Sequence, residues 1–280
     1  MTGIIALQDI HSLAPMPGSV ARLAAILGDP DSNATRVAEV IEFDQALTAN
    51  VLRLANSAWS GAPRHIETVR DAVLRLGGAR ILELAAGQYV AGPMRSPCQG
   101  YGLGECELWR HSVAAALAAE RLGRFAEAAV PGTAFTAALL HDIGKLVLNR
   151  HIRPEALPQL YEAVSSQKIT YLEAERELLG TDHAEVGGEV ARAWKFPDTL
   201  VHAIERHHDP DIEPDPVLDA VHIANAAAKL AGVGLGSEQL NMKASKEAAV
   251  RLRLSSAGLE SLCATVIDEL VKTEALWGIR

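Results

Sequence analysis

The chain has 280 residues, of which 49% are hydrophobic and 22% charged, so it can bury a substantial core and is not a collagen, a coil or a disordered tail. Its 35 acidic residues outnumber the 26 basic ones, giving a formal net charge of -9, and no run of Lys or Arg offers the clustered cations that nucleic acid requires. The longest apolar runs are far shorter than the roughly 20 residues that span a bilayer, which argues against an integral membrane protein.

Helical periodicity runs through almost the whole chain. Ala and Leu recur three and four residues apart, aromatic residues make up 4%, and alternation of β-branched residues is scarce. These patterns predict an all-α fold. In the first part of the chain we expect helices at residues 17–27, 37–41, 46–55, 66–76 and 81–90, separated by Gly, Pro and Asp residues.

A segment rich in helix breakers, residues 93–104, lies between two strongly helical regions. We interpret it as a junction between two packed helical subdomains, residues 1–92 and residues 105–280. The second subdomain is expected to hold helices at residues 106–123, 133–149, 154–167, 170–178, 183–194, 197–208, 217–231, 243–252 and 255–270.

Imidazole and carboxyl groups recur along the second subdomain, each on a different predicted helix. Neutral imidazole nitrogens together with a carboxylate suit a first-row divalent ion, and side chains on converging helices can enclose one. The pattern predicts a site for one or two divalent ions, and iron, manganese, nickel and zinc fit it equally well. The candidate ligands are His111, the pair His141-Asp142, His183 and the pair His207-His208.

The pair His141-Asp142 follows an apolar run, so both side chains are expected to be buried and to need partners. They are either a hydrogen-bonded pair that orients the helix or metal ligands, and Asp142 can bridge two cations. Lys145 shares the helical face of Asp142, where it either contacts a phosphate or is a solvated surface lysine. Asp142 and Lys145 are therefore the candidates for catalytic chemistry.

Each remaining candidate also has a simpler interpretation. His111 would be a hydrogen-bonded histidine in a close-packed, alanine-rich helix, and His183 a polar side chain beside a cap at Thr181 or Asp182. A histidine at a helix C-terminus, as at His207 or His208, complements the macrodipole. The other histidines considered are expected to be structural or exposed: His11, His65, His151 and His202.

The order of these histidines, centred on Leu140–Lys145, resembles the HD superfamily of metal-dependent phosphohydrolases. The first half of the chain resembles the opening helices of the HDOD family. That resemblance implies an all-helical bacterial signal-transduction module, often found beside receiver or cyclic-dinucleotide enzyme domains. The segments that carry it are Leu13–Pro17, Asp29-Pro30, Val40–Thr48, Leu52–Ala58 and Ile66–Gly77.

The resemblance also implies how the ligands divide. One ion would be held by His111, His141, Asp142 and the position of Asn225, and the other by Asp142, His183, His207 and His208. Asn225 stands where the superfamily has an aspartate, and a neutral amide is a poorer ligand than a carboxylate. One firm ion and one weak or absent ion are therefore expected. No Gly-Tyr-Pro follows the histidine pair, which distinguishes this chain from the HD-GYP phosphodiesterases.

Three functions follow from these patterns. The leading one is a signalling module that binds metal and a nucleotide-like ligand and acts mainly through protein partners. The second is an active metal-dependent phosphohydrolase on a nucleotide or phosphate ester, and the third is a scaffold whose histidines are relics. Partner recognition is expected around Asp44–Ala58, unless Leu47, Leu52 and Leu54 belong to the core.

The three cysteines have no CxxC spacing, and the chain opens without a charged and then apolar leader. These features favour a reducing cytoplasm.

Overall fold

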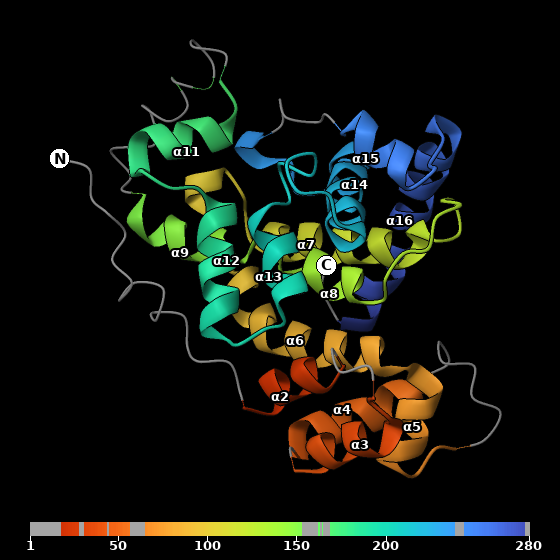
Figure 1. The fold of residues 1–280 in the computed structure, drawn as a ribbon. Helices are drawn as coiled ribbons and strands as arrows, with labels where there is room; N and C mark the ends of the chain where they lie inside the picture. Colours follow the sequence, from red (N-terminus) through yellow and green to blue (C-terminus); the bar gives the residue numbers. More distant parts are fainter. Residues whose placement is uncertain are drawn as a thin grey trace. The chain divides into compact units, whose positions relative to one another are not determined.

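The computed structural model describes residues 18–27, 31–43, 45–56, 65–152, 162, 164, 169–238 and 244–277. Within these ranges all regular structure is helical, apart from two isolated bridges, Cys98 with Leu103 and Ala126 with Leu254 (Figure 1). The predicted all-α class is confirmed. No helix in this part of the chain is both long and apolar enough to cross a membrane.

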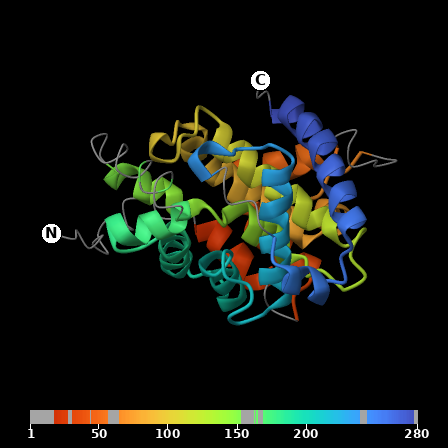
Figure 2. The same ribbon diagram turned by 90° about the horizontal axis from the view of Figure 1, so that it is seen from above.

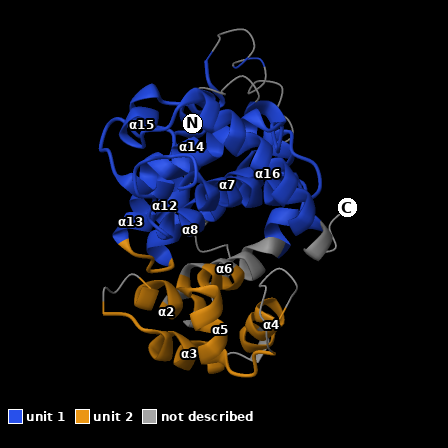
Figure 3. Ribbon diagram, turned by 90° about the vertical axis from the view of Figure 1, so that its right-hand side faces the viewer, with its two compact units in different colours: residues 1–14, 92–193, 198–280 blue, residues 15–91, 194–197 orange. Residues whose placement is uncertain are grey.

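The chain divides into two compact units (Figure 3). The amino-terminal unit comprises residues 15–91 together with 194–197, and the carboxy-terminal unit takes the rest of the chain. Residues 93–104, expected as a junction, are placed inside the carboxy-terminal unit. Helix α6 (Gly78–Arg95) continues through Pro93, and η2 (Gln99–Tyr101) is closed by Gly102, whose positive φ of 64° suits glycine.

Helices α2 (Gly18–Leu27), α3 (Ala34–Glu42), α4 (Gln45–Ala55) and α5 (Val69–Leu76) build the amino-terminal unit with the start of α6. Asn33 begins α3, where its side chain accepts hydrogen bonds from the backbone N–H groups of Thr35 and Arg36, both at 3.1 Å. Thr68 caps α5 in the same way. Hydrophobic periodicity and polar caps therefore explain these helices.

The segment expected to recognise partners lies on and around α4. Leu47 is buried, whereas Leu52 and Leu54 are half-buried. The core interpretation therefore holds for Leu47 and only in part for the other two. Asp44, residues 57–58, and the motifs at residues 13–17 and 29–30 lie outside the described residues.

Helix α7 (Glu107–Leu122) is central to the carboxy-terminal unit and packs against α8 (Thr133–Leu140), α14 (Pro216–Leu230) and α16 (Ser256–Trp277), as Figure 2 shows from above. Its alanines at positions 114–116 and 118 are fully buried, and these small side chains let neighbouring helices approach closely. The other elements of this unit are α9 (Ile143–His151), α11 (Tyr171–Leu179), α12 (His183–Ala193), α13 (Asp198–Glu205), η4 (Gly236–Glu238) and α15 (Lys246–Arg251).

Several predicted helices of this unit have other bounds in the structure, among them α13, which ends at Glu205, and α16, which continues to Trp277. The single helix expected at residues 133–149 is interrupted at His141 and Asp142, so that α8 ends at Leu140 and α9 begins at Ile143. The helix expected at residues 243–252 is shorter, because Ser245 caps α15 by accepting a hydrogen bond from Ala248 N. The helix expected at residues 154–167 falls mostly outside the described residues.

Candidate metal centre

The structure brings all the predicted ligand residues together in the carboxy-terminal unit. Their donor atoms form two groups of three in which all atoms lie within 4.8 Å of one another, and Asn225 of α14 contacts the first group through His111. The groups are His111, His141 and Asp142, and His183, His207 and His208.

Asp142 belongs to the first group, and its carboxylate also lies near the second group. Its Oδ2 atom is 3.6 Å from Nε2 of His111 and 3.3 Å from Nε2 of His141. Its Oδ1 atom is 3.5 Å from Nε2 of His183 and 3.9 Å from Nε2 of His207. One carboxylate oxygen therefore faces each group, which is the arrangement that a bridging ligand requires.

Hydrogen bonds fix the tautomers of four imidazoles. A backbone carbonyl or a carboxylate can only accept, so each Nδ1 atom that contacts one carries the proton and each Nε2 atom keeps its lone pair. These Nε2 atoms are the ones that face Asp142. The Nδ1 contacts are His111 to Val233 O at 3.0 Å, His141 to Ala138 O at 2.6 Å, His207 to Ile204 O at 2.7 Å and His183 to Glu175 Oε2 at 2.7 Å.

Several of these lone pairs have no proton to accept. The Nε2 atoms of His141 and His207 are buried and find no hydrogen-bond partner among the described residues. Nε2 of His111 faces another acceptor, Asn225 Oδ1, at 3.1 Å. Since buried polar atoms are otherwise almost always paired, a cation in each group would satisfy the Nε2 atoms of His141 and His207.

The pKa values favour neutral imidazoles at His111, His207 and His208, whereas at His183 the carboxylate of Glu175 outweighs burial and raises the pKa. Burial lowers the pKa of His111 to about 4. Burial and the neighbouring imidazoles hold the pKa values of His207 and His208 well below the usual range. Neutral rings offer lone pairs to a cation at pH 7.

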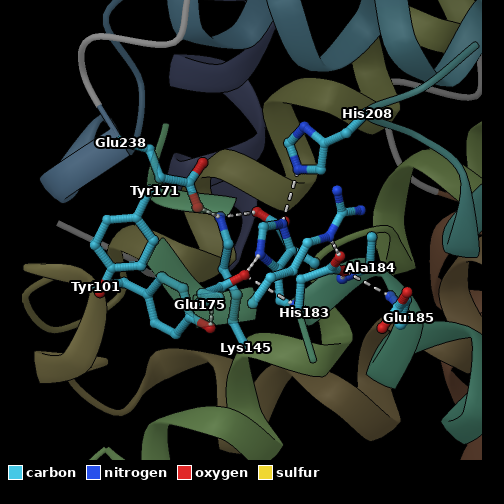
Figure 4. Close-up of polar contacts among 12 residues, drawn as sticks. Tyr101, Lys145, Tyr171, Glu175, His183, Ala184, Glu185, His208 and Glu238 are labelled. Carbon is cyan, nitrogen blue, oxygen red and sulfur yellow. Dashed lines mark hydrogen bonds and ion pairs between the residues drawn. The ribbon is translucent and has the colours of Figure 1, made fainter. Parts of the chain in front are cut away.

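The carboxylate of Asp142 stays ionised despite its burial. Burial alone raises its pKa, but His141 and Lys145 outweigh that effect and hold the pKa well below its usual range. Lys145 Nζ lies 2.8 Å from Asp142 Oδ2. It also lies 2.6 Å from Glu238 Oε1, and Figure 4 shows these two side chains together. Lys145 is 3% exposed, so its interpretation as a solvated surface lysine is wrong.

Glu175 of α11 was not predicted to take part in this site. It is fully buried and accepts from the backbone N–H of His183 at 3.0 Å, from Nδ1–H of the same residue and from the hydroxyl of Tyr101 (Figure 4). One signal could have revealed it, because Tyr171 lies four residues earlier and marks that face of the helix as buried.

Glu238 was also missed. It is buried in η4 between Lys145 and Lys229, and its Oε2 atom lies 2.7 Å from Lys229 Nζ. These two lysines hold its pKa well below its usual range, although burial alone raises it. Nothing in the sequence marks Glu238, because residues 232–241 have the composition of an ordinary loop.

The cap of α12 is Asp182, whose Oδ1 atom accepts from the N–H groups of Ala184 and Glu185, each at 2.9 Å. His183, the first residue of α12, is therefore not the cap, and its imidazole contacts Glu175 and His208. His222 is a further buried histidine, which contacts His207 O at 2.8 Å and accepts from Ser245 N at 2.9 Å. It holds the backbone between the two predicted ligands His207 and His208.

The remaining histidines lie away from the centre, as expected. The side chain of His202 is 27% exposed and contacts Glu213 O at 3.1 Å. His65 is exposed and His151 is half-buried, while His11 lies outside the described residues.

Comparison with known structures relates this fold to that of an HDOD protein. A solved HDOD domain protein of unknown function from Geobacter sulfurreducens is 28% identical, with a TM-score of 0.65 over 94% of this chain and 97% of that one. A protein of Shewanella amazonensis, named a putative phosphohydrolase, is 27% identical, with a TM-score of 0.66 over 95% and 94%. A protein of Marinobacter aquaeolei, named a putative signal transduction protein, shares the fold, with 23% identity and a TM-score of 0.76 over 99% of this chain and 62% of that one.

An uncharacterized protein of Treponema pallidum is 24% identical over 220 residues, which are 77% of this chain. The match covers 42% of that protein, so the chain spans about two fifths of the length of this curated relative. The HDOD domain model matches residues 13–210, well over half of the sequence. The chain therefore belongs to the HDOD family.

Proposed function

We propose that this chain is a bacterial signalling module that binds a divalent metal ion in its carboxy-terminal unit and acts through a bound ligand and protein partners. One observation carries the proposal: four imidazoles with fixed tautomers direct their Nε2 atoms at Asp142, and two of those atoms are buried with no partner in the described chain. This donor set fits iron, manganese, nickel or zinc.

The buried charges support one firm ion and a second, weaker one. Three buried carboxylates, Asp142, Glu175 and Glu238, face two buried ammonium groups, Lys145 and Lys229, so the net charge is 2 - 3 = -1. One divalent ion changes this to +1 and two ions to +3, which is costly in a medium of low dielectric constant.

The weaker ion belongs to the half that contains Asn225. That half depends on His111, His141 and one oxygen of Asp142, and its fourth group is a neutral amide. The other half combines three imidazoles with the second oxygen of Asp142 and is the firm site.

The signalling role follows from family membership and from the relative named for signal transduction. Receiver domains and cyclic-dinucleotide enzyme domains are the partners that we propose. A cytoplasmic location is part of the same proposal and stays a prediction.

Hydrolysis of a phosphate ester is the second candidate function. A cavity of about 250 Å³ touches both His208 and Asn225, so a small molecule can reach both halves of the centre. A divalent ion bound there would supply Lewis acidity toward a phosphoryl oxygen. Two features favour binding without turnover: the amide of Asn225 in the first half, and the use of Lys145 by two carboxylates.

Elemental analysis of the purified protein, followed by assays with phosphodiesters and nucleotides, separates these functions. Stoichiometric metal without turnover is the result that we expect from the signalling module. Bound metal together with turnover would show that the chain is a phosphohydrolase. Absence of metal after purification and after reconstitution would contradict both of these functions. The interpretation as a scaffold with relic histidines would then remain.

A further inference from the structure

A cavity of about 250 Å³ lies beside the metal centre in the carboxy-terminal unit, between α11, the loop after α13 and α14. Its wall includes one residue from each half of the centre. Asn225 is the residue that faces His111, and Nε2 of His208 lies 2.9 Å from Nε2 of His183. Any molecule in this cavity therefore lies against both halves.

Two cations line the cavity at different depths. Lys229 lies one turn after Asn225 on α14 and is buried, whereas the side chain of Arg176 on α11 is 43% exposed. Each keeps donors beyond those used within the described chain. The ammonium of Lys229 has three N–H groups and one carboxylate partner, Glu238, and the guanidinium of Arg176 donates through Nε to Asp182 at 2.6 Å.

The wall also holds two acidic residues, Glu173 with hydrogen bonds inside its own helix cap and Asp209 near a cation. Glu173 accepts from the backbone N–H of Thr170 at 2.7 Å and from its hydroxyl at 2.9 Å. Asp209 lies 3.7 Å from the guanidinium of Arg176. Lys229 and Arg176 are therefore the groups of the wall that have N–H donors to spare, and these two cations can hold an anion.

The remaining wall limits the size and kind of that anion. Leu172 and Ala226 are its apolar residues, and its aromatic rings, among the described residues, are the imidazoles of His208 and His222. A nucleobase would find no broad ring to stack on, and the volume lies below the roughly 300–1,000 Å³ of most ligand pockets. The wall fits a compact, polar molecule.

We propose that this cavity is an anion subsite in which Lys229 and Arg176 hold inorganic phosphate or a phosphate ester of a small polar alcohol. The subsite selects such compounds over nucleotides. The ligand proposed here is therefore smaller than the nucleotide-like ligand expected from the sequence. The inference rests on the proposed metal centre in one respect: an ion there adds the positive charge that the anion would balance.

The test is calorimetric titration of the full chain, with and without metal, using inorganic phosphate, glycerol phosphate and adenosine monophosphate. Inorganic phosphate and glycerol phosphate are expected to bind, and the comparison of the two shows whether the natural ligand is the free ion or an ester. Adenosine monophosphate is expected to bind more weakly than glycerol phosphate. Tighter binding of the nucleotide would overturn the proposed selectivity.

Variants test the two cations. Lys229→Met and Arg176→Gln should each weaken phosphate binding about 10-fold or more, because each removes a charged donor. Arg192→Gln is the matched control, since the Arg192 side chain is also 43% exposed and pairs with Glu189 and Glu205 on and beside α12. Its phosphate affinity should equal that of the unmodified protein.

Lys229→Arg keeps the charge if Lys229→Met does not fold, and it should retain phosphate binding. Unchanged phosphate affinity in Arg176→Gln would overturn the subsite. Metal content of the same samples separates this inference from the proposed function. Bound metal with no phosphate binding contradicts the subsite alone, and phosphate binding that depends on Arg176 in protein unable to bind metal contradicts the metal centre alone.

Discussion

The amide oxygen of Asn225 lies 3.1 Å from Nε2 of His111, the atom of that ring that carries no proton. A neutral amide thus stands at a place where a carboxylate would neutralise a cation. Asn225 is also next to the proposed anion subsite. The residue therefore decides how much positive charge this half of the centre can hold.

Asn225→Asp should raise the metal content from about one ion per chain toward two, because the added carboxylate offsets the charge of the second ion. Elemental analysis of folded, reconstituted protein measures this, and turnover of a phosphodiester is the secondary measurement. Asn225→Ala is the comparison, since it removes the amide without adding charge. Equal metal content in the two variants would show that the carboxylate does not matter.

Asp142→Ala should abolish metal binding, because Asp142 is the one carboxylate that faces both groups of imidazoles. His183→Ala should only weaken the firmer site. The control is Asp268→Ala, which removes an exposed aspartate paired with Lys272 at 2.5 Å. Stoichiometric metal in folded Asp142→Ala would leave His141 and Asp142 as a hydrogen-bonded structural pair.

Glu175→Gln should lower metal affinity about 10- to 100-fold, as removal of a partner that orients a ligand does. Glu175 accepts from three donors, the N–H and Nδ1–H of His183 and the hydroxyl of Tyr101. A glutamine has one acceptor oxygen and would turn its own N–H groups toward these donors. Competition titration with a metal indicator measures the change.

Glu177→Gln is the matched control for that experiment. It lies on the same helix, removes the same charge and is exposed. If both variants bind metal as the unmodified protein does, Glu175 does not position His183.

The helices of this chain were readable from the sequence because their signals are local. The spacing of Ala and Leu predicted α7 and α14, and Asp182, one of the two expected caps, caps α12. The candidate ligands were equally accessible, since His141-Asp142 follows an apolar run and His207-His208 places two imidazoles side by side.

The parts that the sequence missed depend on long-range contacts. The sequence left Lys145 open between a phosphate contact and a surface lysine, because its second partner, Glu238, lies far along the chain in η4. The break between α8 and α9 falls at His141 and Asp142, and neither residue is a Gly or Pro, from which a helix end is usually predicted. The burial of a charged side chain can be predicted only when the positions of its oppositely charged partners in the fold are known.

Removal of metal should lower the stability of the carboxy-terminal unit. At a free metal concentration 100 times Kd, binding contributes about 2.7 kcal/mol, so chelation should lower Tm by about 5–10 °C for a chain of this size. Manganese, iron, nickel or zinc should restore Tm, whereas magnesium and calcium, which prefer oxygen ligands, should not. Differential scanning calorimetry measures both, and Asp142→Asn should not respond to chelation. A similar response in that variant would place the stabilising ion elsewhere.

Gly144 sets the distance between α9, which follows Asp142, and α12, which begins with His183. A Cβ atom at Gly144 would lie 2.0 Å from the carbonyl oxygen of His183 and 2.7 Å from the backbone nitrogen of Gly187. Both are backbone atoms and cannot rotate away as a side chain can. The two helices would have to separate, and the two ligands would move with them.

Gly144→Ala should therefore lower the free energy of unfolding by about 1–3 kcal/mol and weaken metal binding at the same time. Gly92→Ala is the control, because a Cβ there meets nothing within 4 Å on helix α6. That variant should be unchanged or more stable by about 0.5–1 kcal/mol. Urea titration and metal titration of both proteins measure the two effects. If Gly144→Ala matches Gly92→Ala in both, close contact between α9 and α12 does not hold the metal centre in place.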